Sequence, residues 1–195
     1  MGELTDQDLM LKYRQGEAQA MQELLRRYKN PVYHFALRLT SNAVEAEDIA
    51  QEVFLKVHEY RYQYRAIGKF STWLFSIAHN LCVSRFRKNK WFCVWPHHKD
   101  DPEKLMDFES PDPSPKEIAQ QNDTDRIVKD CIQGLPFLQK EALILREYQS
   151  MDYQDIAKVL RKSQATVKIL IYRARQNLKD KLLPYIEEFK GGSHE

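Results

Sequence analysis

Hydrogen-bonding and cationic side chains recur along one face of the segment 164–175. The face carries amide, hydroxyl, phenol and basic groups, contributed by Gln164, Thr166, Lys168, Tyr172, Arg173 and Arg175. Such groups can bond to base edges in the major groove and to phosphate oxygens along the backbone. The chemistry that they indicate is recognition of duplex DNA.

Two short helices joined by a tight turn are predicted to hold this face. Ser163 is a suitable N-cap for the second helix. The inward stripe of that helix repeats every three or four residues and consists of Val167, Ile171, Ala174 and Leu178. The first helix contains Ile156, Ala157, Val159 and Leu160, and only Arg161 and Lys162 separate the two segments. This is helix-turn-helix geometry, although a helical hairpin with a solvated basic face has the same periodicity.

A second stretch, 61–92, interleaves aromatic rings with cations. The rings are those of Tyr62, Tyr64, Phe70, Trp73, Phe75, Phe86, Trp91 and Phe92, and the cations are Arg61, Arg65, Lys69, Arg85, Arg87, Lys88 and Lys90. Single-stranded nucleic acid needs both, because unstacked bases require a π surface and phosphates require positive charge. Burial in a stripe with Leu74, Ile77, Ala78 and Leu81 is the simpler explanation for any one ring, but the cluster as a whole favours nucleic acid.

The N-terminal part of the chain predicts helical scaffolding. Thr5 and Asp8 form a capping pattern for a first helix that stops at Gly16. A second helix covers 17–28, and Pro31 is expected to open a third. These helices supply apolar faces that can position the segments described above.

A longer helix is expected after Asn42, which with Glu45 forms another cap. Its inward positions repeat every four residues, at Ile49, Val53 and Val57. The opposite side is acidic and polar, with Glu47, Asp48, Gln51 and Glu52. Periodicity alone favours ordinary solvation of this side over a binding role.

The segment 100–115 differs in composition from the rest of the chain. It holds four prolines and six acidic residues against one cation, Lys104. Such a segment cannot bury enough apolar surface to fold, which predicts a linker between two helical domains. Either a solvated tether or a segment that follows a basic channel in a partner fits its acidity. Before it, Cys93, His97 and His98 suggest metal or redox sensing as an alternative, but the lack of a second ligand pair at a suitable spacing favours no metal site.

Composition excludes several classes of protein. Of the 195 residues, 43% are hydrophobic, which is enough for packed cores. No apolar run approaches the roughly 20 residues that cross a bilayer, and the first ten residues do not resemble a signal peptide. Three widely spaced cysteines argue against a disulfide framework. We therefore expect a cytoplasmic protein without membrane insertion.

Three stretches, in order, resemble the extracytoplasmic-function sigma factors, the compact members of the bacterial sigma-70 family. They are 46–60, 70–88 and 135–175. The resemblance implies an all-α fold of two small helical domains joined by a flexible, acidic, proline-rich linker. A region 2-like domain would cover 1–95, the linker 96–115, a region 4-like helix-turn-helix domain 116–190 and a tail 191–195.

The resemblance also implies the function and its residues. The protein would direct RNA polymerase core to promoters, without a cofactor, through contacts to the β′ coiled coil and to β, and an anti-sigma factor would restrain it. Core binding falls to Asp48, Gln51, Glu52, Phe54 and Leu55. Recognition and melting of the minus 10 element fall to Tyr64, Lys69, Phe70, Trp73, Asn80, Arg85, Arg87 and Lys88. Recognition of the minus 35 element falls to Ser163, Gln164, Thr166, Lys168, Tyr172 and Arg173.

The chain departs from the family pattern at four positions. Arg161 replaces the usual turn glycine, so the turn must either keep φ below zero or hold a non-glycine residue at some cost. Ile169 and Leu170 replace a small polar residue and an arginine, which removes a phosphate contact and adds apolar surface. Ser84 stands where aspartate is frequent, so base preference does not transfer in detail.

Two other functions compete with this one. A helix-turn-helix regulator that binds operators without polymerase would need neither the aromatic and basic stretch nor the acidic helix. An enzyme such as a nuclease would need clustered carboxylates, and the sequence offers no nucleophile with its base and no phosphate-binding glycine loop. We therefore predict no catalytic residues and no metal ligands.

Overall fold

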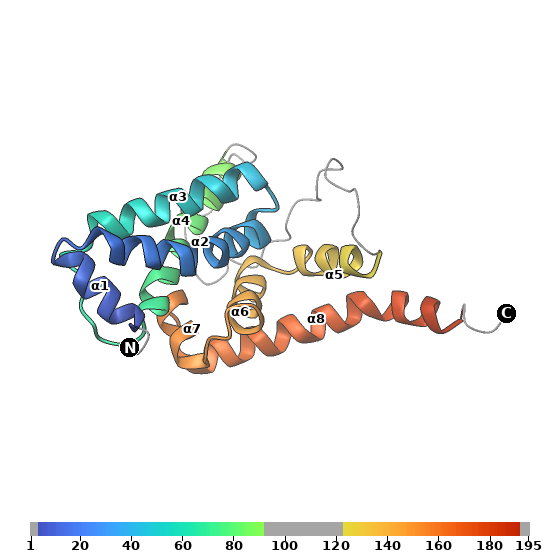
Figure 1. Ribbon diagram of the computed structural model, residues 1–195. Helices are drawn as coiled ribbons and strands as arrows, with labels where there is room; N and C mark the ends of the chain where they lie inside the picture. Colours follow the sequence, from blue (N-terminus) through green and yellow to red (C-terminus); the bar gives the residue numbers. More distant parts are fainter. Residues whose placement is uncertain (1–3, 92–122, 192–195) are drawn as a thin grey trace. The chain divides into compact units, whose positions relative to one another are not determined.

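The computed structural model describes residues 4–91 and 123–191 (Figure 1). Every regular element in these ranges is an α-helix, which confirms the expected all-α class. Packing contacts divide the described residues into two units. The first contains 4–91 and the short segment Gln154–Lys162, and the second contains 123–153 and 163–191. The expected linker at 96–115 lies outside the described residues.

The first unit begins with α1 (Asp6–Arg14) and α2 (Ala18–Thr40). The predicted capping box at Thr5 is present, because its side chain accepts a hydrogen bond from the Asp8 backbone N–H at 3.2 Å and Asp8 accepts one in return. Gly16 lies between the helices with φ of 102°, a conformation that favours glycine. The predicted end of the first helix is therefore confirmed.

The structure corrects the prediction at Pro31. This residue lies inside α2, so one long helix replaces the two that were expected. Proline removes one backbone hydrogen bond, at a cost of about 3 kcal/mol. Leu24, Val32 and Phe35 lie on both sides of it and are fully buried, and each contributes about 1.5–3 kcal/mol through burial. Packing of the continuous apolar stripe therefore outweighs the local cost.

The other two helices of this unit are α3 (Ala43–Glu59) and α4 (Phe70–Trp91). Asn42 caps α3 as predicted, accepting a hydrogen bond from the Glu45 N–H at 3.1 Å. The expected inward positions of α3 are all buried. Between α2 and α4, the rings of Phe35 and Phe75 meet edge to face with centroids 5.3 Å apart. The core of the unit is thus built from one face of each long helix.

The second unit contains α5 (Asp123–Gln133), α6 (Phe137–Glu147) and α8 (Gln164–Gly191). Leu135, Leu143 and Ala174 form a buried cluster against which Leu178 packs. Asn177 on α8 donates a hydrogen bond to the Gln139 amide oxygen on α6 at 2.8 Å. The inward stripe predicted for the last helix therefore packs against α6.

The turn between α7 (Tyr153–Leu160) and α8 is short and hydrogen-bonded. The Lys162 N–H donates to the Ala157 carbonyl at 3.0 Å, which closes the end of α7. Arg161 has φ of 53°, so the turn takes the second of the two conformations considered for it and holds a non-glycine residue in the left-handed region. That conformation costs roughly 1–2 kcal/mol for a residue with a Cβ.

Replacing Arg161 with glycine should stabilise the turn. Glycine relieves the left-handed strain of about 1–2 kcal/mol. It also loses roughly 0.5–1 kcal/mol more chain entropy on folding. The free energy of unfolding should therefore rise by about 0.5–1 kcal/mol. Hydrogen exchange of the α8 amides in the full chain measures it. Gln176→Gly is the control and should destabilise α8 by about 1 kcal/mol. If both variants lost protection equally, the positive φ at Arg161 would be wrong.

Candidate nucleic-acid interface

The polar face of α8 is fixed by its N-cap. The Ser163 hydroxyl accepts a hydrogen bond from the Thr166 backbone N–H at 3.0 Å, which confirms Ser163 as the cap. Opposite the polar face, Val167, Ile171 and Ala174 are buried. The cap and the buried stripe together determine which side chains of α8 point outward.

Most of the residues predicted to read DNA on α8 are exposed. Gln164, Lys168, Tyr172 and Arg173 all lie on its open side, and Tyr172 keeps 65% of its surface accessible. Thr166 is half-buried, and its hydroxyl lies 2.8 Å from the Ser163 hydroxyl. Arg175 is exposed but pairs with Glu147 at 2.7 Å, and this pairing raises the pKa of the guanidinium. The accessible donors are therefore concentrated in the first three turns of α8.

An aromatic cluster holds the start of α4. The Phe70 ring meets Tyr28 edge to face at 5.3 Å and lies 6.0 Å from Tyr64 and 5.8 Å from Trp73. Tyr64 and Trp73 also meet edge to face, at 4.9 Å. Offset and edge-to-face ring pairs of this kind each add about 0.5–1.5 kcal/mol beyond burial. The cluster joins α2, the segment before α4, and α4 itself.

Two aromatic residues expected at the minus 10 surface are therefore core residues. Tyr64 and Phe70 are each 2% exposed, so neither ring offers a face on which a base could stack. Burial also raises the pKa of the Tyr64 phenol. Trp73 is half-buried, and the other members of the predicted set are exposed or half-buried: Lys69, Asn80, Arg85, Arg87 and Lys88. A contribution of Tyr64 and Phe70 to DNA binding would be indirect, through the position of Trp73.

The acidic side of α3 is an open face. Asp48, Gln51 and Leu55 are exposed and lie three or four residues apart, which places them on one side of the helix. Leu55 keeps 62% of its surface accessible, whereas Phe54 keeps 8% and packs in the core. Phe54 therefore supports this face from beneath. The assignment of the set to polymerase binding remains a prediction.

An ion pair connects the α3 face to α4. The Arg85 guanidinium lies 3.1 Å from the Glu52 carboxylate, and both side chains are a little over one-third exposed. No spacing pattern predicts this pair, because the two residues are 33 positions apart. This ion pair thus joins the surface predicted to bind polymerase core to the surface predicted to bind the minus 10 element.

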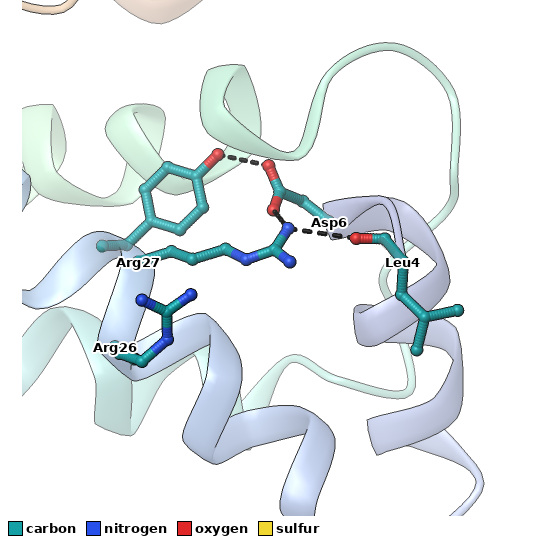
Figure 2. Close-up of a pocket in the computed structure, with 5 residues that line it drawn as sticks. Leu4, Asp6, Arg26 and Arg27 are labelled. Atoms are coloured by element: carbon teal, nitrogen blue, oxygen red, sulfur yellow. Dashed lines mark hydrogen bonds and ion pairs between the residues drawn. The ribbon is translucent and has the colours of Figure 1, made fainter. Parts of the chain in front are cut away.

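A pocket of about 460 Å³ outside the predicted surfaces is lined by Leu4, Asp6, Arg26, Arg27 and Tyr28 (Figure 2). Asp6 accepts hydrogen bonds from Arg27, at 2.8 Å, and from the Tyr28 hydroxyl. Hydrogen bonds from Arg26 and Arg27 lower the pKa of Glu23 to about 2. Because these charges satisfy one another, the network holds α1 on α2. Glu23 pairs with Arg26 and Arg27 at ordinary helix spacing within α2. The Asp6 contacts join residues 21 and 22 positions apart, and no spacing pattern predicts those.

Two further expectations concern metals and membranes. Cys93, His97 and His98 lie outside the described residues. Within 4–91 and 123–191, no three histidine, cysteine or acidic side chains gather as metal ligands would. The helices of these ranges include none with the length and apolar character that a membrane span requires.

Removing the Phe70 ring should destabilise the first unit strongly. A buried Phe→Ala change costs about 3–5 kcal/mol, so Phe70→Ala should lower the hydrogen-exchange protection of the α2 and α4 amides by that amount in the full chain. Tyr62→Ala is the matched control, because Tyr62 is 62% exposed and surface changes stay within about 0.5 kcal/mol. Equal protection in the two variants would contradict the core role of Phe70.

Comparison with known proteins identifies the two units. A family model of sigma-70 region 2 matches residues 24–92, and a model of sigma-70 region 4 matches residues 125–178. The solved structure of the sigma factor RpoE with the anti-sigma factor NepR from Bartonella quintana is similar in fold, with a TM-score of 0.62 at 23% identity over 83% of this chain and 95% of that one. A region 2 match does not favour an operator-binding regulator that acts without polymerase.

Two curated relatives align over nearly their whole length. The RNA polymerase sigma-H factor of Pseudomonas aeruginosa is 31% identical over 190 residues, which cover 94% of this chain and 96% of the relative. The ECF RNA polymerase sigma-E factor of Haemophilus influenzae is 31% identical over 189 residues, which cover 93% and 97%. The chain therefore belongs to the extracytoplasmic-function sigma factors of the sigma-70 family.

Proposed function

We propose that this sigma factor divides promoter recognition among three surfaces. The α3 face binds RNA polymerase core, the start and exposed side of α4 open the minus 10 element, and the open face of α8 anchors the protein on the minus 35 duplex. The observation that carries the proposal is the exposed polar face of α8 behind its Ser163 cap, because it matches the side-chain chemistry of major-groove readout.

Binding to polymerase is assigned to the α3 face by charge and shape. Asp48 and Glu52 supply negative charge, and the exposed Leu55 adds an apolar contact beside them. A cationic helical surface, such as a basic coiled coil, complements this combination. Gln51 lies between these groups and can hydrogen-bond across the interface.

Reversing one charge on α3 should weaken binding to core. Asp48→Arg places a like charge against a cationic partner, and we expect at least about a tenfold loss of affinity in co-elution with purified core polymerase. Glu17→Arg makes the same charge change at the N-cap of α2, where the Glu17 side chain forms an exposed pair with Lys12 of little energetic value. Equal losses in both variants would count against the α3 assignment, and absence of binding by the unaltered protein would refute the function.

Strand opening is assigned to Trp73 and the cations near it. Phe70 and Tyr64 hold the Trp73 ring from the core side, so its exposed part is presented in a fixed orientation. Stacking of an unpaired base on an aromatic ring contributes about 1–3 kcal/mol. That range offsets the few kcal/mol lost when a base leaves the duplex stack. Arg87 and Lys88, exposed further along α4, suit the phosphates.

Two substitutions should separate opening from anchoring. With holoenzyme on a promoter, Trp73→Ala should lower permanganate reactivity of the melted thymines by roughly tenfold and leave duplex affinity nearly unchanged. Lys168→Ala should do the reverse, weakening duplex binding and reducing its salt dependence by about one unit of slope. Unchanged permanganate footprints in the Trp73 variant would remove that residue from strand opening.

The protein contributes binding energy and no covalent chemistry in this proposal. RNA synthesis is catalysed by polymerase core, and the sigma factor acts in the cytoplasm, where core and promoters are. The RpoE relative was solved with an anti-sigma factor. By analogy, we propose that a protein of that class restrains this chain by covering surfaces that core and DNA use.

A further inference from the structure

An apolar side chain lies in the middle of the polar face of α8. Ile169 is 52% exposed, although large aliphatic residues usually gain stability by burial. Lys168 precedes it and Tyr172 follows within one turn, and both are exposed. Ile169 therefore lies on the face of α8 that the proposed function assigns to DNA.

Helix geometry places Ile169 directly opposite the core of the second unit. Residues advance about 100° each around an α-helix, so Ile169 lies about 200° from the buried Val167. Ala165, four residues earlier, is exposed on the same line. Ile169 is the sixth residue of α8, within the N-terminal turns that contact bases in helix-turn-helix proteins.

Cations flank this apolar line. By the same geometry, Lys168 lies on one side of Ile169 and Arg173 on the other, and both are exposed. Phosphate backbones on either side of the major groove would complement these charges. The charge arrangement therefore favours duplex DNA over an apolar protein partner as the occupant of this face.

An isoleucine can read only one feature of a base edge. Its side chain neither donates nor accepts hydrogen bonds, and the apolar group that base pairs present in the major groove is the C5 methyl of thymine. We propose that Ile169 packs against a thymine methyl in the minus 35 element and selects thymine at that position. This specificity role rests on the proposed function, since it requires that α8 enter the major groove.

Deoxyuridine tests the proposal, because it keeps every hydrogen-bonding group of thymine and lacks only the methyl. The probe is a minus 35 duplex selected from a random library with holoenzyme, in which each thymine is replaced singly by deoxyuridine. For the unaltered protein we expect one replacement to weaken binding roughly fourfold, the value of one buried methylene-sized group. For Ile169→Ala, the same replacement should change affinity by less than about 1.5-fold.

Controls separate this role from general effects. Ile169 is exposed, so Ile169→Ala should keep the fold, which the hydrogen-exchange protection of α8 checks. Lys168→Ala should bind more weakly overall and still show the fourfold methyl effect. Ile169→Val, which keeps a branched apolar group, should retain part of the effect.

Each outcome has a distinct reading. If no thymine replacement mattered, or if the effect persisted in Ile169→Ala, the proposal would be overturned, and the apolar line on α8 would be assigned to a protein partner. If the unaltered holoenzyme selected no duplex, the proposed function itself would fail. Selection of a duplex without a methyl effect would leave that function intact.

Discussion

Packing of the Phe70 ring is the interaction on which the first unit depends. Phe70 is the first residue of α4, and its contacts to Tyr28 and Tyr64 fix where that helix begins. Every later residue of α4 is then placed by helix geometry, including the cations that suit DNA. The hydroxyl of the half-buried Tyr28 also donates a hydrogen bond to Asp6, so the same aromatic cluster is connected to α1. Packing of the rings at the start of α4 thus determines where the exposed cations later in that helix lie.

In the second unit, a single helix presents the exposed polar face. One helix, α8, carries a buried stripe and an open face, and a single serine cap sets its first turn. The strained turn at Arg161 is tolerated because residues on both sides of it are buried, among them Leu160 and Val167. Local strain of about 1–2 kcal/mol is small beside the burial of such side chains.

Periodicity and capping patterns predicted the helices and the open face of α8, because both depend on residues three or four apart. Two features depended on distant contacts and could not be predicted. Pro31 lies inside a helix because packing along α2 overrides local propensity. Tyr64 and Phe70 carry aromatic rings that suit either stacking or burial, and only the fold decides between them. The side chains themselves indicated nucleic-acid binding, whereas the polymerase role and the division between the minus 10 and minus 35 elements came from resemblance to a family.

The Glu52–Arg85 pair has a consequence for how the two proposed partners of the first unit influence each other. One guanidinium edge cannot hold a carboxylate and a phosphate at once, so in the proposed function Glu52 would compete with DNA for Arg85. A ligand that draws Glu52 away strengthens the DNA contact, and by thermodynamic reciprocity DNA strengthens that ligand equally. An ion pair that is a little over one-third exposed contributes at most about 1 kcal/mol, so this cooperativity is limited to about fivefold.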